Sequence, residues 1–348
     1  MKNKIFKILF TFIAAVMGVL ITSCDVYDSA GDCSVHYKVP FTFTQNIHNV
    51  DAFPSHVSSV TLYVYDSSGK PVLRKTESGD ALKVAGYTME IDLMPGHYSM
   101  LAWCEGTPTF TPATAFVIGN DDSSITGLSA RLPITDRDES GLYCDRDIVP
   151  LFHGYNADVE LPFTYGDVLL PAIDLMKDTN IFNISIENID GTEMSPDDIS
   201  VHIETDNSEM NWDNSLNGNL SFRHNPWNVT TFSSIREDEE NMRAEGGEDT
   251  HPITGLLAEL TTGRLMVNRR PILVIRRTTD NHDVRFDLVQ LLCMVRGHYN
   301  GNYSDQEYLD RMDFHELTFF VDANLNWYTA AGIRINGWTV VPPASVDV

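Results

Sequence analysis

The chain has 348 residues, a formal net charge of −25 and a hydrophobic share of 43%, which is the composition of a globular protein rather than a disordered one. So acidic a surface repels phosphate backbones, which argues against a nucleic-acid partner. The length predicts two domains, and five cysteines are too few for a scaffold held by disulfides.

The first 23 residues have the pattern of an export signal. Three lysines precede an apolar run over residues 8–21, which is short for a transmembrane helix and typical of a signal peptide. Thr22 and Ser23 are small residues directly before Cys24, as in lipoprotein signals that are cleaved at an acylated cysteine. We therefore predict that residues 1–23 are removed and that lipid on Cys24 holds the protein at a membrane. The alternative is an ordinary secretory signal followed by a chance cysteine.

The mature chain is rich in β-strand patterns. Residues 60–65 alternate aliphatic with polar or aromatic side chains, which predicts a half-buried strand, and residues 66–71 have turn composition. Residues 87–93 and 98–102 alternate again. The apolar faces of such strands need a second sheet to cover them, so we expect a β-sandwich.

A loop-rich stretch follows Cys104, and a second β-rich region begins after a boundary near residues 171–177. We predict two domains, residues 24–172 and 173–348, both all-β with a few short helices. In the second domain the patterns predict strands at 181–186, 265–267 and 272–275, helices at 288–295 and 305–311, and an exposed acidic loop at 236–250.

Motifs of enzymes are missing from the sequence. His315-Glu316 begins like a zinc-protease helix, but Phe319 stands where the second histidine belongs. We find no nucleophile elbow, P-loop or dinucleotide fingerprint. The sequence thus predicts a protein that is not an enzyme and needs no cofactor.

One acidic stretch, residues 136–147, has the spacing of a calcium-binding loop. Oxygen-bearing side chains alternate ahead of a glycine, with an aspartate at the twelfth position: Asp136, Asp138, Ser140 and Asp147. The twelfth residue is shorter than the usual glutamate, and flanking prolines exclude the usual helices. We therefore favour an acidic solvated loop, with calcium as the alternative.

Four cysteines remain after Cys24 in an oxidising compartment, and they allow three complete pairings. Cys33 and Cys104 both flank strand patterns of the first domain, which favours a disulfide between them. The alternative is that they are free buried thiols. Cys293 lies in an apolar run and is expected to be a core thiol.

Several stretches match one family in order and spacing. They are residues 24–34, 60–66, 94–98, 102–104, 151–154, 175–180, DQEYLDR at 305–311, LTFFV at 317–321 and IRINGW at 333–338. Together they resemble the FimB-like family of fimbrial anchor lipoproteins from the type V pili of the Bacteroidia. The resemblance implies two tandem transthyretin-like Greek-key β-sandwiches. It also implies a structural role: a subunit that ties a pilus to the outer membrane, influences its length and contacts the major stalk subunit.

Pili of this class grow by strand addition, which makes the C-terminal segment a candidate donor strand. Ile333 and Ile335 fall on one face of an extended strand and Trp338 falls on the other. Either this strand completes the protein's own second sandwich or it is presented to a stalk subunit. Both roles need an apolar face, so the pattern leaves both open.

The alternative functions are a surface lipoprotein that binds a ligand or glycan, and an accessory or tip subunit of the fimbrium. Exposed tryptophans would support glycan binding, although single tryptophans in β-proteins more often belong to the core. The candidates are Trp103, Trp212, Trp227, Trp327 and Trp338.

Overall fold

A computed structural model describes residues 35–119, 123–236, 251–327 and 332–341. Strands make up 52% of the described residues and helices 10%, which confirms the predicted all-β class with a few short helices. No helix in these four ranges is long and apolar enough to span a membrane.

The first half of the chain builds one large sheet with strand order β13-β1-β14-β12-β5-β2-β3, and β4 pairs with β1. β1 runs parallel to β13 and β14 and antiparallel to β4. The strands are β1 (Val35–Gln45), β2 (Ser59–Asp66), β3 (Pro71–Ser78), β4 (Thr88–Ile91), β5 (Gly96–Glu105), β12 (Leu151–Leu161), β13 (Gly166–Leu169) and β14 (Ile173–Lys177); the short helices are α2 (Phe53–His56), η1 (Asp80–Lys83) and η2 (Ile125–Gly127).

The second half is a sandwich of two six-stranded sheets, β22-β21-β16-β18-β10-β9 and β19-β20-β15-β23-β24-β25. Its core contains Phe182, Leu273 and Phe319, all fully buried. The strands are β15 (Thr179–Asn188), β16 (Ile199–Thr205), β17 (Glu209–Asn211), β18 (Phe222–His224), β19 (Asn228–Arg236), β20 (His251–Gly263), β21 (Ile272–Arg277), β22 (His282–Asp287), β23 (Phe314–Val321), β24 (Ile333–Ile335) and β25 (Trp338–Val340).

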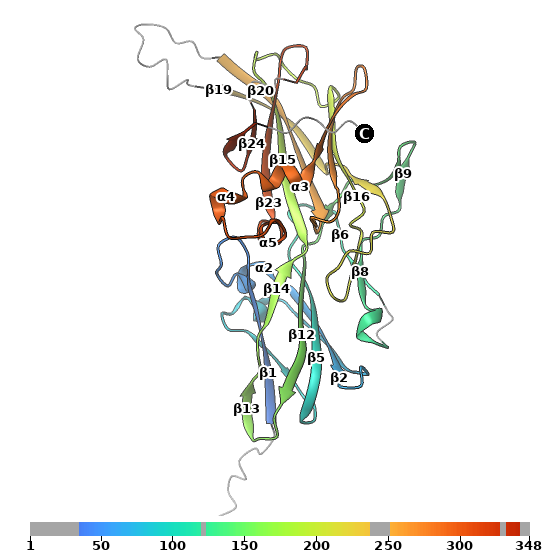
Figure 1. The fold of residues 1–348 in the computed structure, drawn as a ribbon, viewed down its shortest axis with the longest axis vertical. Helices are drawn as coiled ribbons and strands as arrows, with labels where there is room; N and C mark the ends of the chain where they lie inside the picture. Colours follow the sequence, from blue (N-terminus) through green and yellow to red (C-terminus); the bar gives the residue numbers. More distant parts are fainter. Residues whose placement is uncertain (1–34, 120–122, 237–250, 328–331, 342–348) are drawn as a thin grey trace, which may run out of the picture.

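Helices flank this sandwich at α3 (Leu288–Cys293), α4 (Arg296–Tyr299) and α5 (Asp305–Arg311). α5 has the predicted bounds, and its N-cap Ser304 accepts a hydrogen bond from the backbone N–H of Glu307. Figure 1 shows an elongated molecule with β1 and β13 in the lower half, β15 and β20 in the upper half, and α5 near the middle.

The stretch predicted as loop-rich contains short strands that join the two halves: β6 (Ala113–Thr114), β7 (Val117–Ile118), β8 (Ser129–Arg131), β9 (Asp136–Asp138), β10 (Gly141–Cys144) and β11 (Asp147–Ile148). β8 pairs with β17, and β10 pairs with β18, so this stretch completes sheets of the second half. Leu128 and Leu132 also cover the outer face of the first sheet, together with Met210 and Phe222 from the second half.

Because of this cover, the central strands of the first sheet are buried on both faces. In β5, Met100 and Cys104 face one core while Leu101 and Trp103 face the other. The half-buried strand predicted at residues 60–65 is likewise buried on both sides. The prediction of one solvated face is therefore wrong.

The strand predicted at 265–267 and the acidic loop predicted at 236–250 have different outcomes. The strand predicted at 265–267 is wrong: β20 ends at Gly263, and the N–H of Arg269 donates to the Met266 carbonyl in a turn. The acidic segment 236–250 lies almost entirely outside the described residues.

The predicted domain boundary, between residues 172 and 173, coincides with the start of β14. This strand pairs with β1 and β12 of the first sheet. One residue, Asp178, separates β14 from β15 of the second sandwich. The division into two domains remains a proposal, because residues 113–148 belong to the architecture of both halves.

Candidate functional site

The described chain ends in a tight hairpin. Asn336 and Gly337 have φ of +49° and +83°, which suits the two-residue turn that an Asn-Gly pair favours. β24 pairs with β23, and β25 folds back on β24 as the outer strand of the sheet. The prediction of one extended strand through this segment is therefore wrong, and the Asn-Gly pair was the signal that indicated a turn.

The side chains of this hairpin divide between core and surface. Ile333 and Ile335 are fully buried in the core of the second sandwich. Trp338 is 44% exposed, and its ring stacks on His298 with centroids 3.8 Å apart. The apolar face of β24 is thus occupied within the protein's own sheet, and donating it to another subunit would require its removal from β23. Among the described strands, β25 leaves its outer edge unpaired.

The opposite end of the molecule receives the chain from Cys24. We call this end the lower pole: the start of β1 at Val35, the start of β5 at Gly96, and the loops at 92–95 and 162–165. Val35 pairs with Gly166, so β1 enters beside β13, which lies at the bottom of Figure 1. Cys24 itself lies outside the described residues.

The predicted disulfide between Cys33 and Cys104 does not fit this fold. Cys104 is a free, fully buried thiol, while Cys33 lies outside the described residues. On β1, Val35 lies six positions before Phe41. Cys104 is level with Lys177 of β14, which lies four positions beyond the β14 residue that pairs with Phe41. At 3.3 Å per residue, Val35 and Cys104 are therefore roughly 30 Å apart along the strand direction. Two residues of chain span about 7 Å, so Cys33 cannot reach the distance a disulfide requires.

The four residues of the candidate calcium loop form a β-hairpin and its continuation, not one ligand cage. Asp138 pairs with Arg223 at 2.5 Å, and Asp136 pairs with Arg146 at 3.2 Å. Asp147 is buried elsewhere, where it accepts hydrogen bonds from the Phe110 N–H and the Thr261 hydroxyl at 2.8 and 2.5 Å. Ser140 donates its backbone N–H to Asp138. Within the described ranges no three acidic, histidine or cysteine side chains gather as metal ligands.

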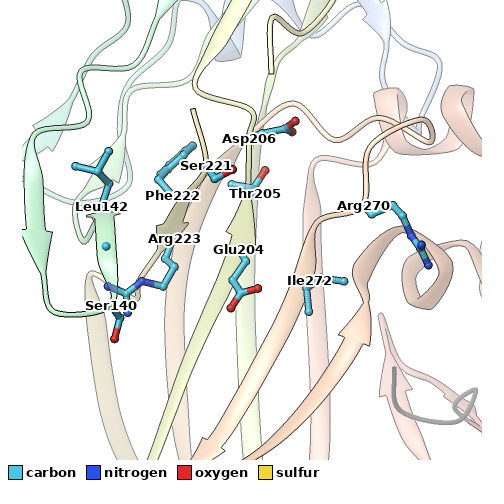
Figure 2. A pocket seen from close by; sticks show the side chains of 11 residues that line it. Ser140, Leu142, Glu204, Thr205, Asp206, Ser221, Phe222, Arg223, Arg270 and Ile272 are labelled. Carbon is cyan, nitrogen blue, oxygen red and sulfur yellow. The ribbon is translucent and has the colours of Figure 1, made fainter. Parts of the chain in front are cut away.

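An open hollow of about 410 Å³ lies beside this hairpin, over β16 and β18. Figure 2 shows Arg223 reaching toward Ser140, with Arg270 standing apart on the far side. The acidic residues in the hollow already have partners: Glu204 pairs with Arg285 and Asp206 with Arg269. Ion pairs of this kind hold neighbouring segments of the fold together.

A buried polar network joins the two halves where β14 passes into β15. Arg264 forms two hydrogen bonds of 2.9 Å to the Asp310 carboxylate in α5 and donates to the Asn214 carbonyl. The Asn214 amide donates to Asp178 at 2.8 Å. Burial raises the pKa of Asp178 to about 7. Lys177 pairs with Asp313 at 2.6 Å, so strand, loop and helix are locked together.

Sequence reasoning missed this network. Its members are single polar residues at strand ends, in loops and in α5, separated by up to 136 positions between Lys177 and Asp313. The one local signal was an arginine, Arg264, directly after a long apolar strand. Of the candidate tryptophans only Trp103 is fully buried; Trp212 and Trp327 are partly buried against the cores, Trp227 stacks on Phe110, and Trp338 is the most exposed of the five.

A family model described as fimbrillin-A associated anchor proteins Mfa1 and Mfa2 matches residues 29–342. The chain belongs to this family. The resemblance noted in the sequence is thereby confirmed, and the protein is a fimbrial component of a family of structural anchor proteins that is associated with the cell surface. No curated protein matches the sequence.

Solved structures extend the relation to the fold. A candidate adhesin from Bacteroides thetaiotaomicron is 25% identical with a TM-score of 0.71, over 90% of this chain and 100% of that chain. A candidate polysaccharide-binding protein from the same organism is 24% identical with a TM-score of 0.69, over 89% and 99%. The fimbrial anchor protein Mfa2 from Porphyromonas gingivalis is 15% identical with a TM-score of 0.59, over 89% and 100%. At such identities the last two show a shared fold.

Proposed function

We propose that the protein is the lipid-anchored subunit at the base of a fimbrium. Acylated Cys24 holds it in the outer membrane, and its upper half contacts the major stalk subunit and influences the length of the pilus. The match to an anchor family over residues 29–342 carries this proposal. The positions of these strands support it, because β1 begins at one end of the molecule while β24 and β25 lie in the other half.

The position of β1 suits a part that bears tension. A pull on Cys24 acts along β1 from its first residue. Tyr37 and Lys38 pair with both β13 and β4, and residues 41–45 pair with β14. A pull along the strand loads these hydrogen bonds in shear, so that many must break together rather than one by one. An anchor gains resistance to detachment from this arrangement.

Metabolic labelling with a fatty-acid probe tests the anchor. We expect label on the wild type and on Cys33→Ala, the control cysteine, and none on Cys24→Ala. Cells with Cys24→Ala should shed their pili into the medium, while the control retains them. Equal labelling of both variants contradicts the proposal. Detection of the protein at the free ends of pili, rather than at the cell, would instead establish a tip subunit.

Glycan binding is the second candidate, favoured by the exposed ring of Trp338 beside His298. Stacked, partly exposed rings provide a face for a sugar ring. A glycan array with the wild type and Trp338→Ala decides this question, because only binding that disappears in the variant would support a site at the hairpin.

A further inference from the structure

Three strongly exposed apolar side chains gather at the lower pole. Met94 is 78% exposed, Phe163 is 82% exposed and Tyr165 is 71% exposed. Met94 lies in the loop before β5, and the two aromatic residues lie in the loop after β12. Because Leu161 pairs with Gly96, these loops leave adjacent strand ends side by side.

Hydrogen bonds from neighbouring tyrosines hold both loops. The hydroxyl of the buried Tyr37 donates to the Pro162 carbonyl, and the hydroxyl of Tyr98 donates to the Met94 carbonyl, both at 2.7 Å. The rings of Phe163 and Tyr165 contact each other edge to face, with centroids 6.4 Å apart. The apolar tips are therefore presented by a braced backbone.

Two ion pairs border these tips, beside the exposed carboxylates of Asp92 and Glu160. Lys38 pairs with Asp167 at 2.5 Å, and His97 pairs with Asp158 at 2.8 Å. An apolar tip that carries a phenol and is bordered by charged side chains matches the boundary between lipid headgroups and acyl chains, where tyrosine side chains concentrate. Strong attraction to an anionic surface is not expected from such a border.

The covalent chain places this pole near a bilayer. Cys24 precedes Val35 by eleven residues, which span at most about 40 Å. A lipid on Cys24 would thus keep the tips at high local concentration beside the membrane, where a small apolar contact is enough to dock. We propose that Met94, Phe163 and Tyr165 insert into the surface of a lipid bilayer, so that the pole is a foot that orients the molecule. This inference rests on the proposed acylation of Cys24.

Fluorescence quenching tests the foot with an artificial tether. The chain from residue 25, with an N-terminal hexahistidine tag, is bound to phosphatidylcholine vesicles that contain nickel-chelating lipid. Brominated phosphatidylcholine should reduce the added emission of Phe163→Trp, measured above the wild type, at least twofold. The control Val229→Trp, 39% exposed on β19 in the upper half, should be unaffected. No quenching of Phe163→Trp overturns the inference, including the case in which residues 25–34 or another surface cover the ring.

Co-sedimentation provides a second measurement. At limiting chelating lipid, Met94→Ser/Phe163→Ser/Tyr165→Ser should reduce the bound fraction at least threefold, whereas Val50→Ser/Val267→Ser, at exposed positions away from the foot, should not. Equal binding of the two variants contradicts the inference. The tether replaces the acyl chains, so this result does not depend on Cys24. Failure here together with positive fatty-acid labelling would refute the foot and leave the anchor intact.

Discussion

At the scale of single residues, four histidines of the described chain are buried, His153, His202, His224 and His315, and burial lowers the pKa of each. Burial lowers the pKa of His153 and His315 to about 4 and that of His224 to about 3. His315 is fully buried and stacks on Phe182 with centroids 4.9 Å apart. Its neighbourhood solvates a charged imidazolium poorly, so protonation favours the unfolded chain.

This makes stability depend on pH in a definite direction. Between pH 6.5 and pH 4 the unfolded chain binds a proton at His315 that the folded protein does not, so the free energy of unfolding falls as the pH is lowered. The contribution of the neutral His315 ring to the stability of the fold is fully present above pH 6.5. We expect His315→Phe to reduce the slope across this window by about 1 kcal/mol per pH unit, measured by urea unfolding monitored by circular dichroism.

Comparison of slopes isolates this residue, because the raised pKa of Asp178 acts in the opposite direction in both proteins. The exposed His48→Gln is the control for loss of a histidine as such. An unchanged slope in His315→Phe would show that the buried ring does not resist protonation.

At the scale of elements, the hairpin packs the side chains of β24 into the core and leaves the edge of β25 free for recognition. Ile335 and Trp338 flank its two-residue turn and form the hydrogen-bonded pair. Arg334 and Thr339 are the next pair, so the N–H of Thr339 points to the free edge of the sheet. That edge is the surface at which an incoming strand can pair.

Thr339→Pro should block strand addition while leaving the sandwich folded, since proline is tolerated at sheet edges and removes a donor that serves no bond within the hairpin. We expect cells with this variant to release pili into the medium and those with Thr339→Ala to retain them. Protease resistance of both purified proteins checks the fold. Retention of pili by both variants would exclude the β25 edge as the contact with the stalk.

At the scale of the whole molecule, the two halves behave as one body because they share structure. Strands β8 and β10 complete sheets of the second half although they come from the first. The network around Arg264 then joins β20, the loop at Asn214 and α5. In the proposed role of an anchor, such a body would transmit a pull from the lipid to the pilus without a hinge.

Arg264→Met leaves the Asp310 carboxylate largely buried without its partner, since the side chains are 10% and 14% exposed. Loss of one partner of such a pair costs about 3–5 kcal/mol. We expect a lower urea midpoint, and two transitions if the halves uncouple. Arg270→Ala is the matched control: its arginine is exposed, 3.5 Å from Asp287, and its loss should cost at most about 1 kcal/mol. Equal midpoints for both variants would show that the network does not stabilise the junction.

The sequence by itself determined what depends on neighbours along the chain. Period-two alternation predicted the strands of an all-β protein, and the acidic first turn of residues 305–311 predicted α5, with bounds that agree with the structure. The ordered motifs from residue 24 to residue 338 identified the family, which the match over residues 29–342 confirms. The lipid on Cys24 stays a prediction.

Tertiary structure decided the features that depend on distant partners. Tyr63 and Tyr65 are buried because residues 128–132 and 210–222 cover them, which no local period can report. Asp136 and Asp138 lie on the same strand, but each pairs with a different arginine supplied by the fold, Arg146 and Arg223, so they do not gather around one metal ion. The direction of the strands, and not the spacing of the cysteines along the chain, places Cys104 at the end of the sheet that is far from Val35. A local pattern specifies which face of a strand is apolar, but the pairing of whole elements decides what lies against it.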